Sequence, residues 1–283
     1  MQYRQLGRSG VRVSALCLGT MNFGASTDEE TSLRIVGQAL EAGINFIDTA
    51  DKYNAGESER VVGRALKPVR DQVVLATKVH LPMGEGPNDK GSSRLHILRG
   101  VEASLERLGL DCVDLLYLHA PDPETPIEES LRALEDLVRA GKVLYVGCSN
   151  FRAWQTAHAL GVQAARGWDG FAAIQPLYNL ANRDCEVEIL PMARELGLGV
   201  VARLQGRYAD SLEHVENVLV VWTAADDISS MAIAEHGLAS ALSESGNVAG
   251  SRAHYERALD FRKRAGDTSG MAYTLISSGT AER

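Results

Sequence analysis

Short apolar runs that end in polar residues recur along the N-terminal part of the chain. Five of them end at Asp48, at Lys78, at His119, at Ser149 with Asn150, and at Gln175. Each run has the length of a buried strand and is bounded by turn residues. In a parallel sheet the carboxyl ends of the strands meet at one edge. We therefore expect these polar side chains to gather at the mouth of a sheet.

Helical patterns separate the runs. Thr27 is the predicted N-cap of the first helix, ahead of the acidic residues 28–30, and Thr125 is the predicted N-cap of a later helix with Pro126 at its first position. The apolar face of the first helix comprises Leu33, Ile35, Val36, Ala39 and Leu40. Further helices are expected at residues 58–66, 93–108, 154–165 and 185–196, and further strands at 15–21 and 199–202.

Alternating strands and helices favour an α/β fold with a parallel sheet, and this many units favour closure into a barrel. Residues 3–16 alternate around Arg8, Ser9 and Gly10 as a hairpin would, and they are expected to plug one end. A loop rich in Gly and Pro, residues 81–92, is expected to overhang the other end. The predicted fold is an incomplete (β/α)8 TIM barrel of about seven βα units after an N-terminal hairpin.

From residue 204 onward the strand pattern is replaced by an internal repeat. Gly206 recurs as Gly246, and His214 recurs as His254 at the same offset. Such self-similarity on helical periodicity predicts a helix-turn-helix repeat, and the second copy resembles tetratricopeptide-type repeats of the longer-period sort found in bacterial regulators. We therefore predict a truncated barrel domain over residues 1–203 and an all-α helical-repeat segment over residues 204–283.

Composition narrows the class of protein. The net charge is −8, and no basic patch suggests a nucleic-acid partner. The four cysteines have no metal-type spacing, so no metal site is predicted and buried thiols in a reducing compartment are favoured. No signal peptide and no apolar run long enough to span a membrane is recognised, so a cytoplasmic protein is expected.

Several motifs at the strand ends identify a family when they are taken together. They are DTADKY at residues 48–53, the lysine that ends the third strand, YLH at 117–119, GCSNF at 147–151 and QPLYNL at 175–180. Their combination over about residues 3–202 resembles the aldo-keto reductases. The resemblance implies a TIM barrel that transfers hydride from NADPH to a small aldehyde or ketone, without a Rossmann fingerprint.

By this resemblance the catalytic residues are Asp48, Tyr53, Lys78 and His119. Carbonyl reduction needs a proton donor, and a phenol with an ordinary pKa of about 10 is a slow acid at neutral pH unless a cation assists it. Lys78 would supply the cation, Asp48 would balance its buried charge, and His119 would orient the carbonyl. The alternative is a barrel salt bridge beside two hydrogen-bonded core residues.

The resemblance also assigns Ser149, Asn150 and Gln175 to the nicotinamide carboxamide of the cofactor. Their alternative role is to cap strand ends. Trp154 and Tyr178 are expected to be packing residues.

After the seventh strand the resemblance ends. The family places a tyrosine under the nicotinamide, where this chain has Arg203, and the family's eighth unit, which carries phosphate contacts, has no recognisable counterpart. Two alternatives to a reductase therefore stay open. One is a catalytically impaired binding or interaction protein with a protein partner or self-association through the helical tail. The other is a non-functional chimera of reductase and repeat segments.

Overall fold

The chain forms two compact units in the computed structural model, which describes residues 1–178, 183–202 and 248–281 together with single positions at 228, 231, 232, 235, 236, 239 and 242. The first unit comprises residues 1–176 and 185–202, and the second comprises residues 177–184 and 203–283. Residues on both sides of the predicted boundary between 203 and 204 lie outside the described ranges, so that boundary stays a prediction. No helix in the described part of the chain is long and apolar enough to cross a membrane.

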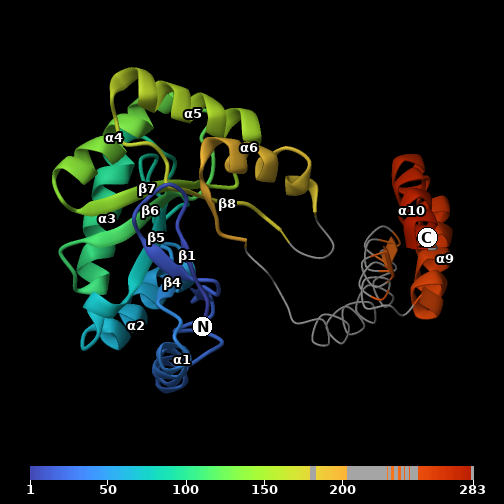
Figure 1. Cartoon of the computed structure of the whole chain (residues 1–283), viewed down its shortest axis with the longest axis horizontal. Coiled ribbons are helices and arrows are strands. Elements are labelled where there is room, and N and C mark those ends of the chain that lie inside the picture. The colour runs from blue at the N-terminus through green and yellow to red at the C-terminus, as the bar shows by residue number, and fades with distance from the viewer. Residues whose placement is uncertain are drawn as a thin grey trace. The chain divides into compact units, whose positions relative to one another are not determined.

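Within the described residues, the first unit contains a seven-stranded parallel sheet whose strands follow one another in chain order. The strands are β3 (Leu18–Gly19), β4 (Phe46–Asp48), β5 (Val74–Val79), β6 (Val113–Leu118), β7 (Val143–Ser149), β8 (Ala173–Gln175) and β9 (Gly199–Val200). Figure 1 shows α3, α4 and α5 along the outer side of the curled sheet. This is the predicted incomplete (β/α)8 barrel.

Helices alternate with the strands and cover the sheet from outside. They are α1 (Glu29–Glu41), α2 (Glu57–Leu66), α3 (Arg94–Leu108), α4 (Ile127–Arg139), α5 (Ala153–Arg166) and α6 (Ile189–Leu196), with short 3-10 turns η1 (Tyr53–Gly56), η2 (Arg70–Gln72) and η3 (Asp184–Glu186). The larger apolar core lies between helices and sheet and includes Leu75, Leu116 and Ile174. Its continuity across the strands explains why each of them reads as an apolar run.

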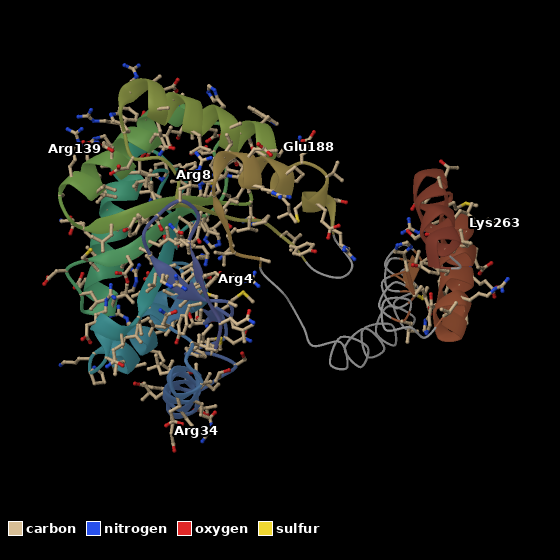
Figure 2. The ribbon with its side chains drawn as sticks, in the orientation of Figure 1. Arg4, Arg8, Arg34, Arg139, Glu188 and Lys263 are labelled. Carbon is tan, nitrogen blue, oxygen red and sulfur yellow. The ribbon has the colours of Figure 1, made fainter. Side chains whose placement is uncertain are left out.

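The N-terminal hairpin consists of β1 (Tyr3–Gln5) and β2 (Arg12–Ser14), which pair antiparallel as predicted. Leu6 and Val13 of this hairpin are buried in a second apolar cluster with Phe46, Leu115 and Tyr117 of the sheet. Figure 2 shows Arg8 at the hairpin tip beside α6, where its guanidinium donates to the backbone carbonyl of Glu195 at 3.0 Å. The hairpin therefore closes the end of the barrel opposite the carboxyl ends of the strands.

Some predicted helix starts were wrong. The N-cap of α1 is Asp28 rather than Thr27, because the Asp28 carboxylate accepts the Thr31 N–H at 2.8 Å. Leu33 of the predicted apolar face is exposed, whereas Val36 and Ala39 are buried. Thr125 does not cap α4, since its hydroxyl donates to Asp122, and Pro126 occupies the N-cap position instead of the first helical one.

The first and last predicted elements of the barrel also differ in extent. Only Leu18–Gly19 pairs as a strand within the predicted 15–21 segment. The predicted helix at 185–196 is divided into η3 and α6. Pro191 explains the late start of α6, because a proline is tolerated in the first turn of a helix but clashes with the carbonyl four residues earlier.

In the second unit, α9 (Val248–Ala265) and α10 (Thr268–Ala281) form a helical hairpin. Gly266 adopts a left-handed conformation in the turn, and Asp267 then accepts both the Gly270 N–H and the Arg262 guanidinium. This hairpin has the helix-turn-helix form predicted for the second repeat copy. Most of the first copy lies outside the described residues.

Candidate active site

The register of the parallel strands brings the polar strand ends together. Asp48 is the last residue of β4, and Lys78 is the penultimate residue of β5. His119 follows β6 directly, while Ser149 and Gln175 end β7 and β8 and pair in register. The structure thus gathers these sequence-predicted residues at one end of the sheet, as their positions after apolar runs indicated.

Lys78 is the centre of this cluster. Its side chain is fully buried, and its ammonium donates to Asp48 Oδ2 at 2.5 Å, to the Thr49 carbonyl at 2.8 Å and to the Tyr53 hydroxyl oxygen at 3.2 Å. Burial alone lowers the pKa of Lys78, but the Asp48 carboxylate and the Tyr53 oxygen outweigh burial and raise that pKa above its ordinary value. The ammonium therefore stays charged beside the phenol.

The loop after β4 fixes the position of Tyr53. Tyr53 begins η1, and the next residues, Asn54 and Ala55, have φ angles of 51° and 54°. The Asn54 amide donates to the carbonyls of Met21 and Phe23 at 2.9 and 2.7 Å, which ties this tight turn to the segment after β3. Tyr53 itself is half-buried.

His119 lies against Tyr53. The two rings meet edge to face with centroids 5.9 Å apart, and His119 is largely buried. Its backbone is held on both sides, because its N–H donates to the Val79 carbonyl at 3.0 Å and its carbonyl accepts the Asn150 amide at 2.8 Å. These bonds fix the backbone of His119, and its ring lies against the phenol ring of Tyr53.

Ser149, Asn150 and Gln175 form a second, connected group. The Ser149 hydroxyl donates to the Gln175 carbonyl at 3.0 Å and accepts the Asn150 amide at 3.1 Å. Gln175 Nε2 donates to Asp48 Oδ1 at 3.2 Å, which links this group to the lysine cluster. Both donors of the Asn150 amide and one of Gln175 are thus engaged within the protein, and the Asn150 Oδ1 and Gln175 Oε1 acceptors bond to none of the described residues.

A set of buried charged residues behind the cluster was missed from the sequence. Glu59 of α2 is fully buried and accepts the Thr77 hydroxyl and the Arg107 guanidinium, both at 2.6 Å. Asp51 is also fully buried, and neither of its oxygens meets hydrogen-bond geometry with a described residue. The sequence contained one signal for such a set. Thr77 is next to Lys78 on β5, so its hydroxyl points to the opposite face of the sheet, toward the helices, where it needs a polar partner.

The environment of Asp51 raises the pKa of its carboxyl group. Burial and then the nearby Glu59 carboxylate raise the pKa of Asp51 to about 7. The Lys52 backbone N–H and the charges of Arg107 and Lys78 act in the opposite direction without offsetting that rise. A carboxyl group that titrates near neutrality therefore lies on the loop between Asp48 and Tyr53.

Three further residues considered in the sequence are Trp154, Tyr178 and Arg203. The packing role expected for Trp154 is wrong, because this residue, at the start of α5, is 64% exposed. Tyr178 is half-buried. Arg203, which stands where the family has its stacking tyrosine, lies outside the described residues.

Comparison with known proteins agrees with the motifs. The profile of the Aldo/keto reductase family matches residues 15–204, and a tetratricopeptide repeat profile matches residues 191–264. The chain is 47% identical over 213 residues to the uncharacterized oxidoreductase YrpG of Bacillus subtilis, covering 71% of this chain and 65% of that protein. It is 37% identical over 227 residues to the versiconal hemiacetal acetate reductase of Aspergillus parasiticus, covering 71% of this chain and 66% of that reductase.

A third relative has a different kind of name. The chain is 39% identical over 221 residues to a probable voltage-gated potassium channel subunit beta of Oryza sativa, covering 74% of this chain and 67% of the relative. The chain thus spans about two thirds of the length of these relatives. The family match, the barrel and the arrangement of the strand ends agree, and this chain therefore belongs to the aldo/keto reductase family.

Proposed function

We propose that this protein is an NADPH-dependent reductase of an aldehyde or ketone in which Tyr53 donates the proton. The observation that carries the proposal is the contact of the Tyr53 hydroxyl with a buried ammonium that Asp48 neutralises. Loss of a proton from the phenol leaves a negative oxygen. The Lys78 ammonium, 3.2 Å away and itself buried, stabilises that charge.

The second group of residues fits a nicotinamide carboxamide. Both donors of Asn150 and one of Gln175 are engaged within the protein, while the Oδ1 and Oε1 acceptors remain available to the carboxamide NH₂. When it is bound there, the cofactor supplies the hydride that reduces the carbonyl carbon. Ser149, Asn150 and Gln175 would hold the carboxamide and thereby fix which face of its ring is presented.

The other residues of the cluster would act on the substrate carbonyl. His119 borders the Tyr53 ring and would donate an N–H to the carbonyl oxygen, so that this oxygen is directed at the phenol. Asp48 touches neither reactant and would keep the ammonium in place through its 2.5 Å contact. In this assignment Tyr53 and His119 contact the substrate, and Lys78 acts through Tyr53.

A second candidate function is protein binding without turnover. It is favoured by the tetratricopeptide match over residues 191–264 and by a relative named as a channel subunit. In the described part of the chain α9 and α10 form one such helical hairpin, and a single repeat of this kind does not bury its apolar face alone, so a partner protein or a second copy could cover it. On this alternative the tetrad of Asp48, Tyr53, Lys78 and His119 would be a remnant of the reductase family.

Titration of the full chain with NADPH, followed by nicotinamide fluorescence, separates the two candidates. We expect saturable enhancement with a dissociation constant in the high micromolar range, because the family match ends at residue 204 and the expected phosphate contacts lie beyond it. Gln175→Leu should weaken binding by about tenfold, since one polar contact of about 1.4 kcal/mol is lost. An absence of saturable enhancement up to millimolar NADPH would reject the reductase and leave the binding protein.

A further inference from the structure

A cavity of about 530 Å³ lies beside the candidate active site and is not lined by any of its four proposed catalytic residues. Its walls are the segment that follows His119, including Pro121 and Ile127, and the start of α5, including Phe151 and Trp154. This volume falls in the range of small-molecule sites. The cavity therefore has room for a compact organic ligand.

Apolar and aromatic groups make up much of the wall. The Trp154 indole is exposed, and Ile127 and Phe151 present apolar surface to the same space. His158 lies one helical turn after Trp154 on the same face of α5 and also lines the cavity. A flat ring could stack on the indole and lose contact with water, which favours an aromatic ligand.

Two charged side chains, Asp122 and Arg152, line the cavity, and they differ in how far they are already engaged within the protein. The Asp122 carboxylate is already used, because it accepts the Ser92 N–H, the Glu124 N–H and the Thr125 hydroxyl at 2.7 to 2.9 Å. Burial raises the pKa of Asp122, but these hydrogen bonds outweigh it and hold that pKa below its ordinary value. Asp122 is thus an ionised part of the wall, with its hydrogen-bonding capacity directed into the protein.

Arg152 is the available cation. It lines the cavity at the start of α5, and its guanidinium forms an ion pair with none of the described residues. A guanidinium binds one carboxylate through two parallel hydrogen bonds, and no carboxylate of the described chain competes for it. The negative charge of Asp122, which lines the same cavity, would oppose a dianion such as phosphate more strongly than a monoanion.

We propose that this cavity binds a small aromatic monocarboxylate, with its ring on Trp154 and its carboxylate on Arg152. The two walls also connect the cavity to the catalytic end of the barrel. Asn150 lines the cavity and donates to the His119 carbonyl, and Asp122 anchors the end of the 81–92 loop through Ser92. A bound ligand would thus touch residues that hold His119 and the overhanging loop in place.

The probe is 2-naphthoate, titrated into the full chain without cofactor and followed by calorimetry and tryptophan fluorescence. We expect saturable binding, with Trp154→Phe losing the fluorescence change. Arg152→Gln should weaken binding at least tenfold, because the only matched cation is removed. Arg166→Gln, at the other end of α5, removes the same charge away from the cavity and should bind as the unaltered protein does.

A second arm does not depend on any variant folding correctly. The neutral analogue 2-naphthamide has the same ring without the charge, and it should bind the unaltered protein at least tenfold more weakly. Equal affinity for the acid and the amide would overturn the proposal, as would undiminished binding to a folded Arg152→Gln variant or no saturable binding below about 10 mM. None of these readouts requires reductase activity, so a failure here is distinct from a failure of NADPH binding.

Discussion

The ammonium nitrogen of Lys78 lies 2.5 Å from Oδ2 of Asp48, and both side chains are almost completely shielded from water. Such a pair is weak evidence for stability as a whole, but it makes each partner dependent on the other. Removing one charge leaves the second one buried and unbalanced. The pair therefore couples the stability of the barrel to the geometry of its mouth.

Asp48→Asn should destabilise the protein by about 3–5 kcal/mol, the usual cost of leaving one member of a buried pair alone. Glu57→Gln is the matched control, since its pair with Arg60 is about half exposed on both sides and should change stability by less than about 1 kcal/mol. Urea unfolding followed by circular dichroism measures both. Equal, small effects for the two variants would show that Lys78 finds another counter-charge.

Tyr53→Phe tests the proposed proton donor. The variant keeps the ring that packs against His119 and removes only the hydroxyl, so turnover should fall by roughly 10² or more while the melting temperature stays nearly constant. Tyr145→Phe removes a hydroxyl from β7, away from the tetrad, and should retain turnover. Steady-state rates with NADPH and a panel of aldehydes measure both variants, and undiminished turnover in Tyr53→Phe would discard the assignment.

The meeting of Asp48, Lys78 and Gln175 at one end of the sheet was predictable, because each follows an apolar run and parallel strands align their carboxyl ends. The roles of these residues came from the family resemblance instead. Asp51 was not predictable as a buried charge, since nothing local distinguishes it from a surface carboxylate, and for Glu59 the one signal was its partner Thr77 on β5. The burial of Glu59 depends on α2 packing against α3, which is a contact between segments distant in sequence.

Local competition explains the misplaced helix starts. Thr27 and Asp28 both have side chains that can cap a helix, and the sequence does not decide which oxygen reaches the free N–H. Thr125 likewise has a capping side chain, but Asp122 accepts its hydroxyl at 2.8 Å. Trp154 was expected to be a packing residue, but it is 64% exposed.

Asp51 should make stability depend on pH. Its carboxyl has a pKa of about 7 when folded and near 3.8 when free, so the folded state keeps a proton that the unfolded state loses. The contribution of Asp51 to the free energy of unfolding is therefore fully present below about pH 4 and is lost as the pH rises through 7. Between pH 5 and pH 8 the titration of Asp51 alone should lower the free energy of unfolding by about 2–3 kcal/mol, at 1.36 kcal/mol for each pKa unit.

Asp51→Asn removes this titration. The stability of the variant relative to the unaltered protein should therefore rise by about the same amount over that interval, as measured by urea unfolding at pH 5, 6.5 and 8. Asp71→Asn, at an exposed position in η2, should keep a constant offset over the same range. Parallel pH profiles for Asp51→Asn and the unaltered protein would mean that Asp51 is ionised in the folded state.

Substitution by alanine should have opposite effects on protein stability at two helical glycines, Gly63 and Gly161. Gly63 lies on α2 where that helix crosses the end of α3, and a Cβ there would be 2.2 Å from the Leu108 carbonyl oxygen. Because the obstructing atom belongs to the backbone, the helices must separate, and overpacking of this kind costs about 1–3 kcal/mol. Gly161 on α5 has nothing within 4 Å of the same position, so alanine should stabilise by about 0.5–1 kcal/mol through helix propensity.

The close packing of Gly63 against Leu108 also keeps the buried Glu59 within reach of Arg107. Leu108 follows Arg107, and Arg107 forms the 2.6 Å ion pair with the buried Glu59 one turn before Gly63. Separation of α2 from α3 in Gly63→Ala would lengthen that pair and admit water to Glu59 and Asp51. The variant should therefore lose both stability and part of the pH dependence assigned to Asp51, whereas Gly161→Ala should keep the full pH dependence. Unfolding of both variants at pH 5 and pH 8 tests this, and a Gly63→Ala variant as stable as Gly161→Ala would contradict the close packing of the two helices.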